Sequence, residues 1–152
     1  MAVGGSCSSG TCNPLYYLHD GTSWTKTPLT TTPPAGLFIG IWGSSATNIF
    51  LVGRFSGAGG SSQDRAVVTI LDGTNWSTTY LDKGYGLNGI WGDGLGAIYS
   101  VGDGGHILRH ASGGWSLMTT GSIMSLHGVW GSGANDVFAV GEGGTILHKC
   151  AP

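Results

Sequence analysis

Short runs of apolar residues recur along the whole chain, each bounded by glycine or by a polar turn. They are rich in Val, Ile, Phe and Tyr, residues that favour β-strands. No stretch carries apolar residues at helical spacing between capping residues. The runs follow a fixed order, and we name them innermost (38–43, 87–92, 126–131), second (48–53, 97–102, 136–141), third (67–70, 106–109, 145–148) and outermost (around Trp24, Trp76 and Trp115).

The runs repeat at a constant spacing. Trp91 and Trp130 of two innermost runs are 39 residues apart, and so are Trp76 and Trp115. Glycine-rich links such as 102–105, and Asp-Gly at 72–73, are hairpin signals because glycine readily adopts a positive φ. A four-stranded antiparallel unit of about 40 residues is the size of one β-propeller blade. The sequence therefore predicts an all-β chain, a β-propeller of four-stranded antiparallel blades, with about three to three and a half blades per chain.

The repeats divide the chain into four predicted units. Residues 1–36 form a partial blade that lacks its first strand and most of its second, residues 37–82 and 83–120 form blades, and residues 121–152 form a blade without its outermost strand. The second unit carries about ten extra residues between Arg54 and Arg65, a Gly/Ser-rich segment expected to be an exposed loop. We expect deletion of 57–62 to leave the fold intact.

Composition and charge exclude several classes of function. Charged residues make up 9% of the chain and the net charge is -2, so no basic surface for nucleic acid is expected. No apolar run is long enough to span a bilayer, which predicts no membrane insertion. The chain begins without signal-peptide features, so it is either a cytosolic protein or a cut or mature form, and of these an extracellular or cell-surface parent protein is slightly favoured. Cys7 and Cys12 could close a small disulfide loop, or they and Cys150 could all be free thiols.

The tryptophans of the innermost strands are candidate site residues. Trp42, Trp91 and Trp130 are expected to pack between adjacent blades, where a large aromatic buries about 150–250 Å². The alternative is that they line pockets between blades and stack against sugar rings. Trp24, Trp76 and Trp115, at the start of the outermost strands, are expected mainly to lock turns.

Polar residues of the loops form a second candidate group. In a propeller, the loops that join the second to the third strand lie on the same face as those that lead into the next blade. That face would gather carboxylates, imidazoles and an aromatic ring able to bind a polyol or a cation: Asp103, His106, Glu142, Tyr85, Asn88 and His127, with Arg54, Gln63, Asp64 and Arg65 of the insertion. The alternative is that Asp103 and Glu142 are solvated hairpin residues.

Catalysis finds little support in the sequence. His19, His110 and His148 recur near the ends of third strands, one per blade, where a ring would hold them apart and no metal site would form. The glycines alternate with strands and never open a helix, so no nucleotide-binding pattern is present. We therefore expect no enzyme activity and no cofactor.

The chain resembles the tryptophan-rich bacterial propeller repeats, which read roughly Gly-Val-Trp-Gly, Asp-Val-Phe-Ala-Val-Gly and Gly-Thr-Ile-Leu-His. Residues 126–148 match this pattern almost throughout, 87–115 closely, and 38–76 with the insertion. The Asp-Gly-x-x-Trp sequences at 20–24 and 72–76 are similar to those of small fucose-binding propeller lectins. The resemblance implies a propeller fold and carries little information on function.

We interpret the chain as a non-catalytic, lectin-like carbohydrate-binding module with shallow sites repeated once per blade. The alternative is a protein-interaction or structural scaffold, possibly a fragment of a larger or designed repeat protein. About three blades cannot close a ring, because propellers usually contain four to eight. We therefore expect a homodimer that forms one closed ring of six or seven blades, with a glycan or a protein as ligand.

Overall fold

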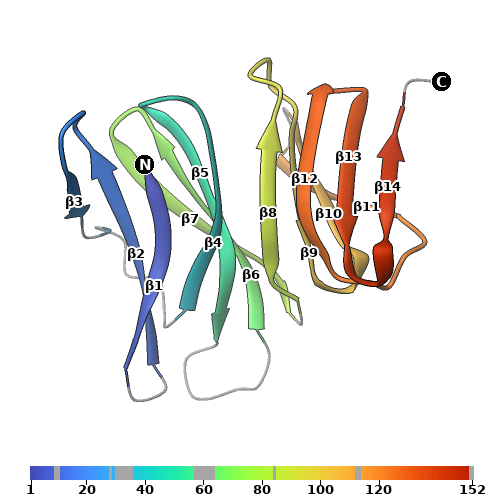
Figure 1. Ribbon diagram of the computed structural model, residues 1–152, viewed down its shortest axis with the longest axis horizontal. Helices are drawn as coiled ribbons and strands as arrows, with labels where there is room; N and C mark the ends of the chain where they lie inside the picture. Colours follow the sequence, from blue (N-terminus) through green and yellow to red (C-terminus); the bar gives the residue numbers. More distant parts are fainter. Residues whose placement is uncertain are drawn as a thin grey trace.

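The computed structural model describes residues 1–8, 11–27, 29, 36–56, 64–83, 85–111 and 114–150. Its strands form four antiparallel sheets that stand side by side (Figure 1). The prediction of an all-β chain built from antiparallel, blade-like sheets of three or four strands is confirmed.

The first sheet contains β1 (Ala2–Ser8), β2 (Thr11–His19) and β3 (Trp24–Thr27) in that order. The second contains β4 (Gly36–Ser45), β5 (Asn48–Ser56), β6 (Asp64–Asp72) and β7 (Asn75–Lys83). The third contains β8 (Leu87–Gly92), β9 (Ile98–Gly102), β10 (Ile107–Ala111) and β11 (Gly114–Met118). The fourth contains β12 (Leu126–Gly133), β13 (Asp136–Gly141) and β14 (Ile146–Lys149).

Two expectations about the first half of the chain need correction. β1 is seven residues long and pairs along its whole length with β2, so the first sheet lacks an innermost strand but has a full second strand. The segment expected to be an exposed loop is partly strand, because β5 runs to Ser56 and β6 begins at Asp64. Phe55 in this extension is 1% exposed and packs on Phe38 at 5.4 Å between ring centroids. Residues 57–63, where the proposed deletion falls, lie outside the described residues.

The sheets contact one another mainly through their innermost strands: β4 packs against β8, and β8 against β12 (Figure 1). The first sheet contacts β4 through both β1 and β2. Successive side chains of a strand point to opposite faces of its sheet. One set of apolar side chains therefore contacts the next sheet in chain order, and the other set contacts the preceding sheet. The core is therefore divided into layers between sheets.

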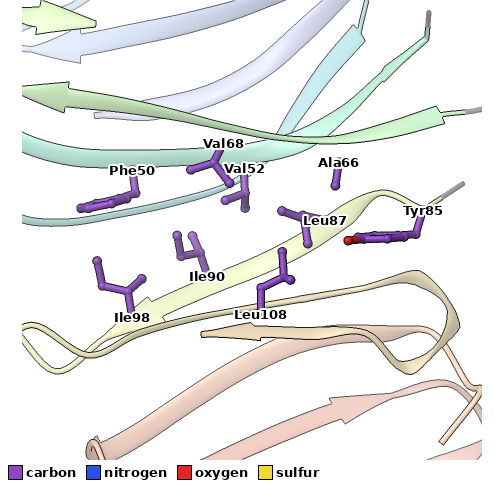
Figure 2. Close-up of a cluster of buried hydrophobic side chains, with 9 residues drawn as sticks. All are labelled: Phe50, Val52, Ala66, Val68, Tyr85, Leu87, Ile90, Ile98 and Leu108. Atoms are coloured by element: carbon purple, nitrogen blue, oxygen red, sulfur yellow. The ribbon is translucent and has the colours of Figure 1, made fainter. Parts of the chain in front are cut away.

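Figure 2 shows the layer between the second and third sheets. Phe50, Val52, Ala66 and Val68 point from β5 and β6 toward Leu87, Ile90, Ile98 and Leu108 of the third sheet. Val52, Ala66, Val68 and Leu87 are fully shielded from solvent. Comparable clusters fill the other two interfaces, centred on Leu51 and Val67 before this layer and on Tyr99, Val137 and Leu126 after it.

The glycine of the Val-Gly pair in the second, third and fourth sheets is required by close backbone approach. A Cβ on Gly102 would overlap the carbonyl oxygen of Gly86, and a Cβ on Gly53 or Gly141 would overlap that of Leu37 or Ser125. A three-residue 3₁₀ turn follows at Asp103–Gly105 and again at Glu142–Gly144. At each of these Val-Gly pairs, the backbone of the second strand therefore lies directly against the backbone at the start of the innermost strand.

The cysteines are only partly described. Cys7 and Cys12 occupy paired positions of the β1–β2 hairpin, and their side chains lie outside the described part of the chain. Cys150 is a free, exposed thiol.

Candidate functional site

Two of the three innermost tryptophans lie between sheets. The ring of Trp42 fills the space that a Cβ on Gly92 would need, and the ring of Trp91 does the same over Gly131. Each tryptophan thus packs on a glycine in the innermost strand of the next sheet. Such close contact requires glycine, because any side chain there would displace the indole ring. Trp130, at the same position of the fourth sheet, is 61% exposed.

Three of the predicted loop residues meet in one hydrogen-bonded cluster, which we name the rim network. Asn88 Nδ2 donates to Asp103 Oδ1 at 2.9 Å and to the Leu126 carbonyl oxygen at 3.0 Å. Arg54 Nη2 donates to Asn88 Oδ1 at 2.9 Å and lies 3.3 Å from Asp103 Oδ1. The Gly86 N–H donates to Asp103 Oδ2 at 2.9 Å. These bonds join the second, third and fourth sheets.

The rim network also sets the protonation of its carboxylate. Burial acts to raise the pKa of Asp103, but hydrogen bonds from Asn88 and Gly86 and the charges of Arg54 and His127 outweigh it, and the pKa is lowered from its ordinary value of 3.8. Both carboxylate oxygens of Asp103 accept hydrogen bonds within the protein. The arrangement supports a structural role for Asp103, and it differs from the freely solvated hairpin carboxylate considered from the sequence.

Acid should weaken the fold through this carboxylate. Because the folded state holds the pKa of Asp103 below 3.8, its contribution is present above that pH and is lost as the pH falls through the lowered value. Thermal unfolding measured from roughly pH 5 to pH 2 should show a steeper loss of melting temperature for the wild type than for Asp103→Asn. Asp72→Asn, at an exposed carboxylate of the hairpin between β6 and β7, is the matched control. Identical pH profiles for the wild type and Asp103→Asn would contradict this assignment.

The remaining predicted loop residues lie near the rim network but are not part of its hydrogen-bonded cluster. Tyr85 and His106 stack at 4.1 Å between ring centroids, with 9° between their planes, and His106 Nδ1 lies 2.6 Å from the Asp103 carbonyl oxygen. In the fourth sheet, His127 Nε2 lies 3.6 Å from Glu142 Oε1, and both side chains are more than half exposed. The side chain of Asp64 and all of Gln63 lie outside the described residues.

A groove with aromatic walls, the outer groove, opens between the second and third sheets on the side of their outer strands. It has a volume of about 720 Å³ and is lined by Arg65, Tyr80, Leu81, Tyr85, His106, Leu108, Trp115 and Leu117. The Arg65 guanidinium lies 5.2 Å from the centre of the Tyr80 ring, within the range of a cation–π contact. Among the described residues, Arg65 Nε and Trp115 Nε1 are buried and have no hydrogen-bond partner.

Part of the lining of the outer groove is predicted by the sequence. Tyr85, His106 and Arg65 were candidates, and Trp115 was expected mainly to lock a turn. Tyr80, Leu81, Leu108 and Leu117 were missed because they are ordinary strand residues whose side chains become neighbours only when two sheets pack. Of these four, only Tyr80 could have been singled out from the sequence, because it is an aromatic residue in an outermost strand, as Trp115 is.

The third-strand histidines pair with aromatic rings. His19 lies 4.9 Å from Trp24 and His110 lies 5.1 Å from Trp115, measured between ring centroids, while His148 stacks on Phe138 at 4.0 Å. Burial lowers the pKa of His110. Over the described ranges, no three His, Cys, Asp or Glu side chains gather where they could hold a metal ion.

No family model, no curated protein and no solved structure matches the chain. Within the described segments, no helix is long and apolar enough to cross a membrane.

Proposed function

We propose that the protein is a non-catalytic, lectin-like carbohydrate-binding module and that the outer groove is a sugar-binding site. The observation that carries the proposal is the gathering of Tyr80, Tyr85 and Trp115 around one groove together with Arg65 and His106. Its volume of about 720 Å³ lies within the usual range for small-molecule sites. A site of this kind combines apolar walls with a few polar groups that orient the ligand.

The chemistry of the lining suits a sugar. The C–H face of a pyranose is apolar and can pack on an aromatic ring, while its hydroxyl groups need donors and acceptors. Arg65 supplies guanidinium N–H donors, and His106 supplies an imidazole. Trp115 adds an aromatic wall, and its buried indole N–H has no hydrogen-bond partner among the described residues.

The corresponding tryptophan of the second sheet has a different neighbour. Trp76 packs on Tyr16 of the first sheet, with 5.5 Å between ring centroids. By strand register, the position of Tyr16 is occupied in the second sheet by Val68, because Tyr16 pairs with Val3 and Val68 pairs with Val52. The smaller valine leaves Trp115 without that aromatic partner, which supports a groove at this interface.

Self-association belongs to the same proposal. The four sheets follow one another without closing a ring, and in the described part of the chain no strand joins the fourth sheet to the first (Figure 1). We propose a homodimer that completes a closed ring of six or seven blades. Two copies would then present two outer grooves, and weak single-site affinity would be strengthened by avidity.

A structural or protein-interaction scaffold is the second candidate. It is favoured by the apolar side chains that the fourth sheet exposes, including Trp130, Val140 and Ile146. A scaffold would bind protein but no sugar, so the experiment below separates the two functions.

Glycan binding can be tested with a glycan array followed by titration of any ligand found. Trp115→Ala should weaken binding by at least about tenfold, which corresponds to about 1.4 kcal/mol, because it removes one aromatic wall. Since Trp115 also packs against the core, Trp115→Phe and a melting curve for each variant separate binding from stability. Trp24→Ala, which removes an exposed tryptophan outside the groove, is the matched control. Absence of any bound glycan, or equal affinity in Trp115→Ala and the wild type, would refute the site.

A further inference from the structure

The fourth sheet exposes an apolar face that is covered by the following sheet in both the second and the third sheet. Trp130, Phe138, Val140 and Ile146, which we name the open face, are 61%, 36%, 46% and 69% exposed. Strand register makes them equivalent to Trp91, Tyr99, Val101 and Ile107 of the third sheet. Tyr99 and Val101 are 1% and 0% exposed, because the fourth sheet covers them.

The same comparison identifies the missing partner of Trp130. Trp42 packs over Gly92 and Trp91 packs over Gly131, so these two innermost tryptophans each occupy a glycine site on the next sheet. In the described part of the chain, no sheet follows the one that carries Trp130. Gly43 is the glycine of this series that receives no tryptophan, because the first sheet shows no innermost strand among the described residues.

The site over Gly43 is hollow. A cavity of about 330 Å³, the Gly43 hollow, is lined by Met1, Ile41, Trp42, Gly43, Ser45, Ala46 and Ile49. Its lining is mostly apolar, as a site for an indole ring requires. The chain therefore exposes a tryptophan without a glycine site at one end and a glycine site without a tryptophan at the other.

We propose that the open face docks on a second copy of this chain, with Trp130 of one copy in the Gly43 hollow of the other. The contact is head-to-tail and repeats the tryptophan-on-glycine packing of the two contacts inside the chain. It specifies the joint of the ring proposed above and does not depend on sugar binding. A head-to-tail contact must either close or propagate, and two such joints close a dimer.

Charge at the rim favours the same partner. The residue after each Val-Gly is Arg54, Asp103 and Glu142 in the second, third and fourth sheets. Arg54 contacts Asp103 of the next sheet at 3.3 Å. At the proposed joint, Glu142 of one copy faces Arg54 of the other, so opposite charges meet again. Glu142 is more than half exposed in the single chain.

The first sheet constrains how the joint forms. β12 of the second copy would take the innermost position that the first sheet lacks. Because β1 and β2 already pack against β4, this sheet has to shift outward to admit β12 and the strands that follow it.

Sedimentation velocity or light scattering at micromolar concentration tests the joint. The wild type should have about twice the chain mass of 15.5 kDa. Trp130→Ala should raise the dimer dissociation constant at least about 100-fold, as loss of a central aromatic anchor does. Ala46→Phe, which fills the Gly43 hollow from an exposed turn, should do the same. Trp24→Ala is the control for loss of an exposed tryptophan and should remain a dimer.

Mixing the two defective variants gives the sharpest result. Trp130→Ala keeps the Gly43 hollow and Ala46→Phe keeps Trp130, so a mixture contains one intact joint and should form a heterodimer although neither variant dimerises alone. A wild type that is monomeric at all concentrations, a dimeric Trp130→Ala, or a mixture that stays monomeric overturns the proposal. Glycan titration of monomeric Trp130→Ala is independent, because the outer groove lies within one chain, and so the two proposals can fail separately.

Discussion

Replacing Trp91 by alanine is expected to lower the free energy of unfolding by about 3 kcal/mol, the lower end of the range for deleting a large aromatic side chain, because the Trp91 ring is only partly buried. The indole ring fills the space over Gly131 and lies 6.4 Å from the ring of Tyr99. Its loss would leave a cavity between the third and fourth sheets that the backbone around Gly131 cannot fill. The interface would lose apolar contacts on both sides.

Chemical denaturation of the wild type and Trp91→Ala measures this difference. Trp24→Ala is the matched control, since Trp24 is 55% exposed and should change stability by less than about 0.5 kcal/mol, as surface substitutions do. The comparison should be made with Trp130→Ala as the background, so that dimer formation does not contribute. An unchanged unfolding free energy in Trp91→Ala would show that the ring is not part of the packed interface.

A side chain at Gly102 is expected to be similarly damaging, at about 3 kcal/mol for Gly102→Val, the upper part of the range for overpacking. A Cβ there would overlap the Gly86 carbonyl oxygen, and backbone cannot rotate away as a side chain can. Separating the backbone at Gly102 from the backbone at Gly86 would also strain the hydrogen bond from the Asp103 N–H to the same oxygen, which is 3.0 Å long. The rim network would then lose its alignment.

Gly133→Ala is the control for this substitution, because a Cβ on Gly133 meets no atom within 4 Å and its φ is not positive. Alanine at such a site is expected to be neutral or slightly stabilising, since it restricts the unfolded chain. Thermal melts of both variants decide the matter. Equal melting temperatures for Gly102→Val and Gly133→Ala would mean that the backbone at Gly102 yields easily.

Much of the fold could be predicted because each repeat carries local signals. Alternating Val, Ile and Phe bounded by glycine specify strands, and the constant 39-residue spacing specifies which strands belong together. Asp72-Gly73 and the glycines after Val101 specify hairpins, and Gly73, Gly104 and Gly105 do adopt positive φ. The sequence does not predict that the strand continues through Arg54 and Phe55, because the Gly/Ser-rich segment that follows them suggests a loop. In the structure, Phe55 is buried and the strand extends beyond it.

The candidate site was harder to predict because it depends on contacts between repeats. The sequence predicts that Asn88 and Asp103 lie on one face of the molecule. It does not predict their mutual hydrogen bond or the contact of Arg54 from the preceding sheet, because both depend on how the sheets stack. The same limit applies to Tyr80 and Trp115, which are separated along the chain and meet across an interface. Equivalent tryptophans also differ in environment, since Trp91 is covered and Trp130 is not, and only the position in the stack distinguishes them.

The packing of each innermost tryptophan on the glycine of the following sheet gives the stack a direction. Each of the two middle sheets presents a tryptophan ring on one side and a glycine on the other. A duplicated sheet would therefore fit between its neighbours without changing either of them. Duplication of one 39-residue unit would therefore lengthen the chain while the two ends kept their chemistry. Chains of different length could then share one closing contact, and the number of units per chain, rather than any new interface, would decide how many copies complete a ring.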